Sequence, residues 1–350
     1  MSVLVAPAAL GGELRAAVVA AAIGRGLERA GLGPPDLCPV AGGGRGTIEV
    51  LLPALGGETA GARVLDARGR EVAAAFALVD GGATAIVEAA QLAVGDVVAA
   101  SRSSATPRGG ARPGVNDALP PSAPAEGAPP GACGRLAAST FGVGQLVVAA
   151  IDAGAEVVVV ACGGAAGGAG GAVEAIERGG GLRGATLVAL REGRTSGAGL
   201  AAGLAARLGA AGGLAAGAAA RLGAAGGLAA GPAARLGTPV GLAAGLATAL
   251  GARLVPGAQF VLEELGFDAR MRAARAVVTG EARLDATTLD GRVAGAIAIR
   301  ARQAGVPCHA VVAVDALTRF DARILDLQAI VEAHTIAQLE AAGERLAQVL

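Results

Sequence analysis

Two β-α-β units, one near each end of the chain, restrict the fold of this protein most. Over Ser2–Val40, a short apolar run leads into a helical pattern at Glu13–Ala30 and then into a second run. Near the other end, predicted strands at Ala276–Thr279 and Cys308–Val314 flank a helical pattern at Thr287–Ala304. Strands joined in this way form parallel sheets, and the loops that follow them gather at one sheet edge. Both units therefore predict an α/β protein with a parallel sheet.

The middle of the chain predicts a second structural unit. Short strand-like runs at Ala62–Leu65, Val72–Val79 and Ala85–Glu88 are separated by glycine-rich turns, which is typical of an antiparallel meander. A helix over Phe141–Asp152 follows, and Val261–Arg275 is predicted as another helix. A chain of 350 residues is also too long for one compact core. We therefore expect two domains.

Composition limits what the core can contain. Hydrophobic residues make up 53% of the chain but aromatic residues only 1%, so Ala, Val, Leu and Ile must fill the interior. Residues 101–134 are rich in Pro, Gly, Ser and Ala and predict a flexible surface loop. Residues 206–237 repeat the unit ARLGAAGGLAAG. Its glycines weaken any helix, so a low-complexity expansion is favoured over a functional solenoid.

Charge and residue usage exclude several functions. The 29 basic and 29 acidic residues cancel, which argues against a nucleic-acid-binding protein. The sequence contains no Lys, so a phosphate loop that depends on lysine is impossible. Four separate cysteines and the lone His309 and His334 favour structural roles over metal binding. Without a leader or a long apolar segment, we expect a cytoplasmic protein with no membrane partner.

The segment Val277–Arg292, VVTGEARLDATTLDGR, is the most complete candidate site. Glu281, Arg283 and Asp285 follow an apolar strand, at the sheet edge where ligands of parallel sheets bind. The carboxylates could hold Mg²⁺ or polarise a hydroxyl, and the arginine could grip an anion. Alternatively, Asp285 only caps the next helix while Glu281 and Arg283 form an exposed pair. Residues alone leave both interpretations open.

This segment resembles the TGEGRLDxQTxxGK motif of the type-I glycerate kinases, and further resemblances follow in the family's order. These are Ala6-Pro7 with Gly12 and Leu14, PVAGGGRGT (Pro39–Thr47), Gly56-Gly57-Glu58, DGGATAIVEAA (Asp80–Ala90), STFGVGQL (Ser139–Leu146), CGGAAGGAGG (Cys162–Gly171) and the stretch Gly241–Asp268. Together they cover most of the chain outside residues 101–134 and 206–237. We interpret the chain as a divergent member of this family.

The resemblance implies a fold, a reaction and a set of site residues. The fold is a discontinuous Rossmann/flavodoxin-like parallel-sheet domain, residues 1–56 and 259–350, with an inserted α/β domain over residues 57–258. The reaction is the ATP-dependent phosphorylation of D-glycerate, with Mg-ATP and glycerate in the cleft between the domains. Catalytic roles fall to Glu281, Arg283 and Asp285, with Glu281 and Asp285 as Mg²⁺ ligands. Substrate or phosphate contacts fall to Gly43, Gly44, Glu88, Gly163, Gly164, Thr288 and Arg292.

Departures from the family pattern leave activity open. Ala8, Ala9 and Gly11 stand where the family has Asp, Ser and Lys, and Gly42 and Arg45 stand where it has Asp and Glu. Arg292 replaces a lysine, and the family's DVDNPL segment is missing or reduced to Leu190–Arg194. Glu88 could contact substrate or could be a strand-end carboxylate satisfied by nearby N–H groups. The chain is thus either a working glycerate kinase or an inactive relative that retains the fold or ligand binding.

Overall fold

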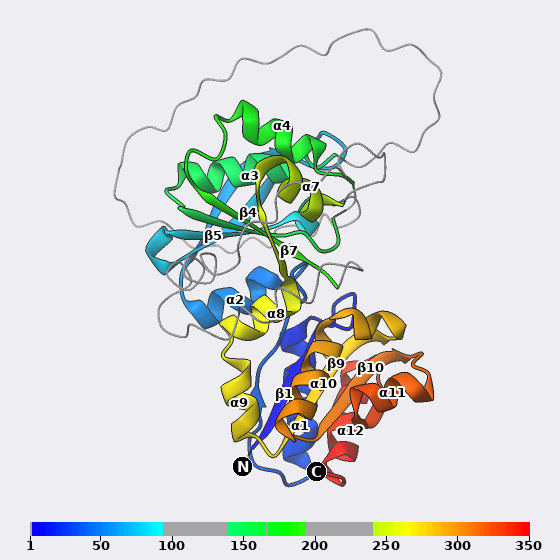
Figure 1. The fold of residues 1–350 in the computed structure, drawn as a ribbon. Helices are drawn as coiled ribbons and strands as arrows, with labels where there is room; N and C mark the ends of the chain where they lie inside the picture. Colours follow the sequence, from blue (N-terminus) through cyan, green and yellow to red (C-terminus); the bar gives the residue numbers. More distant parts are fainter. Residues whose placement is uncertain (1, 94–138, 166, 194–240) are drawn as a thin grey trace, which may run out of the picture.

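The computed structural model describes residues 2–93, 139–165, 167–193 and 241–350 (Figure 1). The predicted loop at 101–134 and the repeat at 206–237 lie outside the described residues. Two sheets are stacked end to end, and the two termini lie close together at the end of the molecule far from the second sheet (Figure 1).

The first sheet is entirely parallel and has the order β11-β10-β9-β1-β2. Its strands are β1 (Val3–Pro7), β2 (Asp36–Leu37), β9 (Ala276–Leu284), β10 (Cys308–Asp315) and β11 (Leu327–Glu332). Numbered along the chain, these strands have the flavodoxin-like order 2-1-3-4-5. The predicted parallel sheet, assembled from both ends of the chain, is confirmed.

The second sheet is mixed and has the order β3-β4-β5-β6-β7-β8. Its strands are β3 (Glu58–Leu65), β4 (Glu71–Val79), β5 (Thr84–Glu88), β6 (Val157–Ala161), β7 (Thr186–Arg191) and β8 (Arg253–Pro256). The first three pair antiparallel, as the meander predicts, and pairing from β5 onward is parallel. All six strands fall between β2 and β9 in the chain. The domain limits at 56/57 and 258/259 remain predictions.

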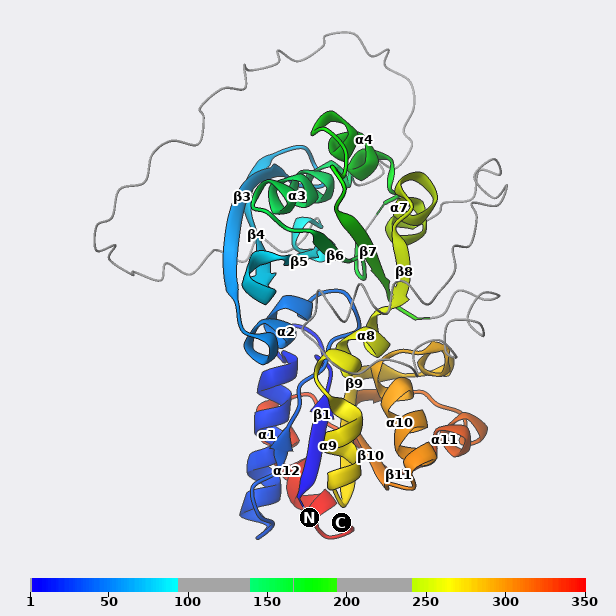
Figure 2. The ribbon, with the colours of Figure 1, turned by 60° about the vertical axis from the view of Figure 1, so that its left-hand side comes forward.

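Helices cover both sheets and separate them (Figures 1 and 2). Around the first sheet lie α1 (Ala16–Arg29), α9 (Phe267–Ala273), α10 (Val293–Ala304), α11 (Arg319–Leu325) and α12 (Ile336–Ala347). The outer face of the second sheet carries α3 (Phe141–Asp152), α4 (Gly170–Arg178) and α7 (Leu242–Leu250). Between the sheets lie α2 (Thr47–Leu55) and α8 (Gly257–Glu264). Short 3-10 turns are η1 (Asp80–Gly82), η2 (Ala89–Leu92) and η4 (Ala286–Asp290).

One apolar cluster joins the two halves of the molecule. It includes Leu4 of β1, Leu51 of α2, Ile86 of β5 and Val261 of α8, all of which are fully buried. Aliphatic side chains dominate this core, with a few Phe such as Phe267. The composition therefore sets the core chemistry as expected, and α2 and α8 hold the sheets in a defined arrangement.

Several element boundaries differ from the sequence prediction, and for three of these differences the structure shows a physical cause. The helix expected over Val261–Arg275 is two helices, because Gly266 between α8 and α9 adopts a left-handed conformation (φ 61°). The helix expected from Thr287 begins only at Val293, after η4 ends at the left-handed Gly291. Strand β9, expected to end at Thr279, continues to Leu284 because it pairs with β10 as far as Asp315.

None of the helices in the described part of the chain has the length and apolar character needed to cross a lipid bilayer.

Candidate active site

A cleft of about 890 Å³ opens at the carboxyl ends of β1 and β9. The chain runs from β1 to one side of the first sheet and returns on the other side with β9, so this is the switch point of the strand order. The loops after β1 and β2 and the starts of α2 and α10 line the cleft on one side. Glu88, Gln91 and Glu192 line it from the second sheet. The cleft therefore lies between the two sheets.

Glu281, near the end of β9, is the most deeply buried acidic residue of this cleft. It is only 5% exposed, and its Oε1 lies 2.9 Å from Nε of Arg292. Its Oε2 is buried without a hydrogen-bond partner. Glu281 thus presents one paired and one unpaired oxygen. The alternative that Glu281 forms an exposed pair with Arg283 is wrong.

The surroundings of Glu281 hold its proton unusually tightly. Burial raises the pKa of Glu281 to about 7, against the lowering effect of Arg292 and of a hydrogen bond from the backbone N–H of Ala294. Nearby Glu192 and Asp285 raise the pKa further by charge repulsion. A carboxyl group with a pKa near neutrality inside a cleft is typical of functional sites.

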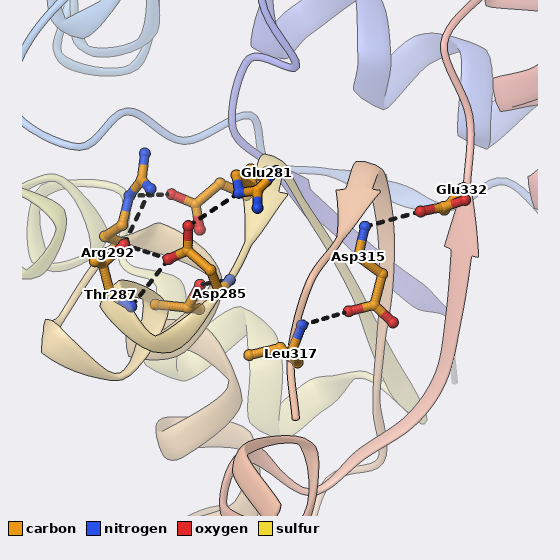
Figure 3. A network of polar contacts seen from close by, with 9 residues as sticks. Glu281, Asp285, Thr287, Arg292, Asp315, Leu317 and Glu332 are labelled. Carbon is orange, nitrogen blue, oxygen red and sulfur yellow. Dashed lines mark hydrogen bonds and ion pairs between the residues drawn. The ribbon is translucent and has the colours of Figure 1, made fainter. Parts of the chain in front are cut away.

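Asp285 shares a network with Arg283, Thr287 and Arg292, beside Glu281 (Figure 3). Its Oδ1 accepts hydrogen bonds from the backbone N–H (2.9 Å) and the hydroxyl (2.5 Å) of Thr287. Its Oδ2 faces Nε of Arg283 at 3.2 Å. The hydrogen bonds from Thr287 are the main reason that its pKa is lowered. Asp285 therefore caps η4, as the second interpretation of the sequence held.

Thr288 is buried at this cap, whereas Arg283 is exposed beside it. Thr288 is fully buried, and its hydroxyl accepts a hydrogen bond from the backbone N–H of Asp285 at 3.1 Å. The side chain of Arg283 is 54% exposed. Neither residue is among those that line the cleft within the described part of the chain. Their substrate and catalytic roles stay predictions.

The glycine-rich turns pack backbone against backbone between the two sheets. A Cβ on Gly43 would lie 2.6 Å from Cα of Gly257, and one on Gly44 would lie 2.7 Å from the carbonyl oxygen of Gly163. The backbone N–H of Gly163 also donates to the carbonyl of Gly43 at 3.0 Å. Close approach explains why these positions are glycine. The predicted phosphate contacts of Gly43, Gly44, Gly163 and Gly164 stay predictions.

Glu88, at the end of β5, faces the N-terminus of α2. Its Oε1 accepts the backbone N–H of Ile48 at 2.6 Å, while burial raises its pKa. Glu281 has the same relation to α10 through the N–H of Ala294. Two strand-end glutamates therefore each meet a helix N-terminus, where a negative charge is favourable. Glu88 has the N–H partner that one interpretation expects, and it also lines the cleft. Its contact with substrate stays a prediction.

Other cleft residues escaped the sequence reasoning. Glu13, Arg15, Glu49, Gln91 and Glu192 all line the cleft. Glu192 follows directly after β7, inside the segment Leu190–Arg194 that was compared with the family's DVDNPL, so its place after a strand was the signal that could have found it. Glu13 lies between the matched Gly12 and Leu14, and the other three residues match no motif residue. Neither His309, which is buried, nor His334 lines the cleft, and the described cysteines Cys38, Cys162 and Cys308 are buried and free.

The carboxylates fit Mg²⁺ only in part. Within the described residues, no group of three or more His, Cys, Asp or Glu side chains could hold a metal ion. Mg²⁺ commonly uses one or two carboxylates together with substrate phosphates, so a smaller set suffices. Of the expected pair, Glu281 has a free, buried oxygen, whereas both oxygens of Asp285 are engaged. Asp285 as a metal ligand stays a prediction that requires these contacts to rearrange.

Fold and cleft together define an α/β protein with a cleft at a strand switch point, the place where open parallel sheets commonly bind ligands. The sequence matches the Glycerate kinase family over residues 3–109 and 233–349. This chain belongs to that family.

Several individual proteins are similar to this chain. An uncharacterized protein of Mycobacterium bovis is 33% identical over 88% of this chain and 77% of its own length. A glycerate kinase of Bacillus subtilis is 32% identical over 49% of this chain and 37% of its own length. Among solved structures, a putative glycerate kinase 2 from Salmonella typhimurium LT2 has a TM-score of 0.62 at 22% identity. That match covers 100% of this chain and 98% of the other. This structural likeness shows a shared fold.

Proposed function

We propose that this protein is a glycerate kinase, which transfers a phosphoryl group from ATP to a hydroxyl of D-glycerate in the presence of Mg²⁺. The observation that carries the proposal is the Glu281–Arg292 pair, which lies in the switch-point cleft of a chain that belongs to the glycerate kinase family. Phosphoryl transfer needs positioned cations around the transferring group, with little covalent chemistry from the protein.

Charge in the cleft explains why a divalent cation is needed. The cleft is lined by Glu13, Glu49, Glu88, Glu192 and Glu281 and by Arg15, Arg45 and Arg292. Carboxylates thus outnumber guanidinium groups, and the starts of α2 and α10 already have glutamate partners. A bound Mg²⁺ supplies positive charge that neutralises the phosphate oxygens. The arginines attract the carboxylate of glycerate and the nucleotide phosphates, and Arg292 also keeps Glu281 in place.

The proposal is tested by measuring ADP release with ATP, Mg²⁺ and a panel of small hydroxy acids. We expect turnover that requires both glycerate and Mg²⁺, with glycerate preferred over the other hydroxy acids. Absence of glycerate-dependent ADP release at high enzyme concentration would overturn it.

One observation favours a second candidate, an inactive relative that binds ligands. The loops after β1 and β2 present Ala8, Ala9, Gly11 and Gly42 to the cleft, and none of these residues brings a polar side chain. Groups that act together in catalysis lose far more activity than single substitutions suggest. Thermal stabilisation by glycerate without ADP release would support this alternative, and robust turnover would exclude it.

A further inference from the structure

Glu192, directly after β7, is a second carboxylate of the cleft that contains Glu281. Both residues line this cleft. The carboxylate of Glu192 has no hydrogen bond or ion pair with any of the described residues. Two neighbouring carboxylates repel each other when both are ionised. A cation between them would remove this repulsion.

The carboxylate of Glu192 lies against two glycines. A Cβ on Gly163 would lie 2.9 Å from Oε2 of Glu192, and one on Gly42 would lie 3.4 Å from its Oε1. The Cβ on Gly42 would also lie 3.6 Å from Cγ2 of Val293, at the start of α10. The carboxylate of Glu192 therefore lies in the space that a side chain at position 42 would enter, beside the helix end that Glu281 faces.

Glu281 supplies the independent sign that a ligand binds here. Its side chain is more than nine-tenths buried, it lines the cleft, and its Oε2 has no hydrogen-bond partner. An unpaired buried carboxylate oxygen is costly unless a ligand satisfies it. Asp285 is less suited, because Thr287 and Arg283 already engage its two oxygens.

We propose that Glu192 and Glu281 together bind one divalent cation, and that this pair, rather than Glu281 and Asp285, holds the Mg²⁺ of the site. The inference rests on the proposed function for the identity of the cation. Two carboxylates leave the remaining positions around Mg²⁺ to water and phosphate oxygens, which is the usual arrangement in phosphate-transferring enzymes. Glu192, directly after β7, thus supplies the negative charge beside Gly42.

Mn²⁺ titration of the full-length protein in the presence of ADP, followed by calorimetry, tests the assignment. We expect Glu192→Gln to weaken Mn²⁺ binding about tenfold or more, on the scale of lost metal-site contacts. Asp285→Asn should change the Mn²⁺ affinity by no more than about twofold, because Thr287 and Arg283 already engage the oxygens of Asp285. Glu49→Gln removes a negative charge from another part of the same cleft and controls for general electrostatic attraction. Weaker binding by Asp285→Asn than by Glu192→Gln would overturn the proposal.

A second experiment moves the carboxylate from position 192 to position 42. A Cβ at Gly42 would meet its neighbours at ordinary contact distances, and Glu192→Ala frees the space beyond it. Gly42→Asp in a Glu192→Ala background should therefore restore Mn²⁺ binding to within about tenfold of the original protein. Thermal melting confirms that each variant is folded. Failure of Gly42→Asp to restore binding in folded protein would contradict the shared-space argument.

Both experiments measure Mn²⁺ binding and do not require the protein to phosphorylate glycerate. If the protein shows no glycerate-dependent ADP release but Glu192→Gln loses Mn²⁺, the kinase proposal fails and the cation site stands. If the protein phosphorylates glycerate and Glu192→Gln binds Mn²⁺ normally, the cation site fails and the kinase proposal stands.

Discussion

Nε of Arg292 lies 2.9 Å from Oε1 of Glu281, and this ion pair joins the residue before α10 to the end of β9. The same guanidinium donates from Nη1 to the hydroxyl of Thr287 at 3.3 Å. Arg292 therefore links a buried carboxylate to the 3-10 turn that Asp285 caps (Figure 3). Glu281 depends on this arginine for its only ion pair among the described residues.

Arg292→Gln should destabilise the protein, because it leaves the ionised Glu281 buried without its partner. We expect the free energy of unfolding at pH 8 to fall by about 1–3 kcal/mol. Arg292→Lys keeps the charge but not the planar geometry, so its free energy of unfolding should lie between those of the original protein and Arg292→Gln. Urea unfolding measures these differences. If Arg292→Gln/Glu281→Gln is not more stable than Arg292→Gln alone, the pair does not act as described.

Glu281→Gln should stabilise the protein at high pH relative to low pH. The folded pKa of Glu281 is about 7 and its ordinary value is 4.5, so the folded state holds the proton more tightly than the unfolded state. The contribution of Glu281 to stability is therefore fully present below about pH 4.5 and is lost as the pH rises to about 7. An amide cannot ionise, yet its oxygen can still face Arg292. The free energies of unfolding of Glu281→Gln and of the original protein are compared at each pH. From pH 5 to pH 8, this difference should shift in favour of Glu281→Gln by up to about 3 kcal/mol. A pH-independent difference would contradict the raised pKa.

Gly44→Ala should disturb the contact between the two sheets. Its Cβ would lie 2.7 Å from the carbonyl oxygen of Gly163, and backbone on both sides leaves little room to yield. We expect a loss of about 1–3 kcal/mol in the free energy of unfolding, as for other overpacked interiors. Gly170→Ala is the matched control, because its Cβ would meet no atom within 4 Å. Equal effects of the two substitutions in thermal melts would show that steric contact is not the cause.

Asp285 variants separate a structural cap from a chemical role. Asp285→Ala removes the acceptor for the N–H of Thr287 and should cost about 1 kcal/mol of stability, whereas Asp285→Asn keeps an acceptor and should cost less. If Asp285 also takes part in catalysis, both variants should abolish glycerate-dependent ADP release. Full activity of Asp285→Asn would limit this residue to capping.

Local patterns made much of the fold predictable. The meander over β3 to β5 and the helix Phe141–Asp152 follow from short-range periodicity and glycine turns, which depend only on neighbouring residues. Boundaries failed where the backbone conformation of one glycine decided the outcome. Gly266 and Gly291 end helical segments in the left-handed conformation, and a helical periodicity pattern cannot show which glycine does so.

The amino-acid sequence by itself determined the parallel sheet built from both chain ends, the aliphatic core and membership of the glycerate kinase family. Strand periodicity, residue volume and ordered motifs are properties of the chain that need no partner. Tertiary structure alone decided that Glu281 pairs with Arg292 rather than Arg283, and that Glu192 lies in the same cleft as Glu281, beside Gly42 and Gly163. These contacts depend on how β7 of one sheet and β9 of the other meet across α2 and α8. A local sequence pattern cannot predict this contact between the two sheets, because it arises from the packing of residues that are far apart in the chain.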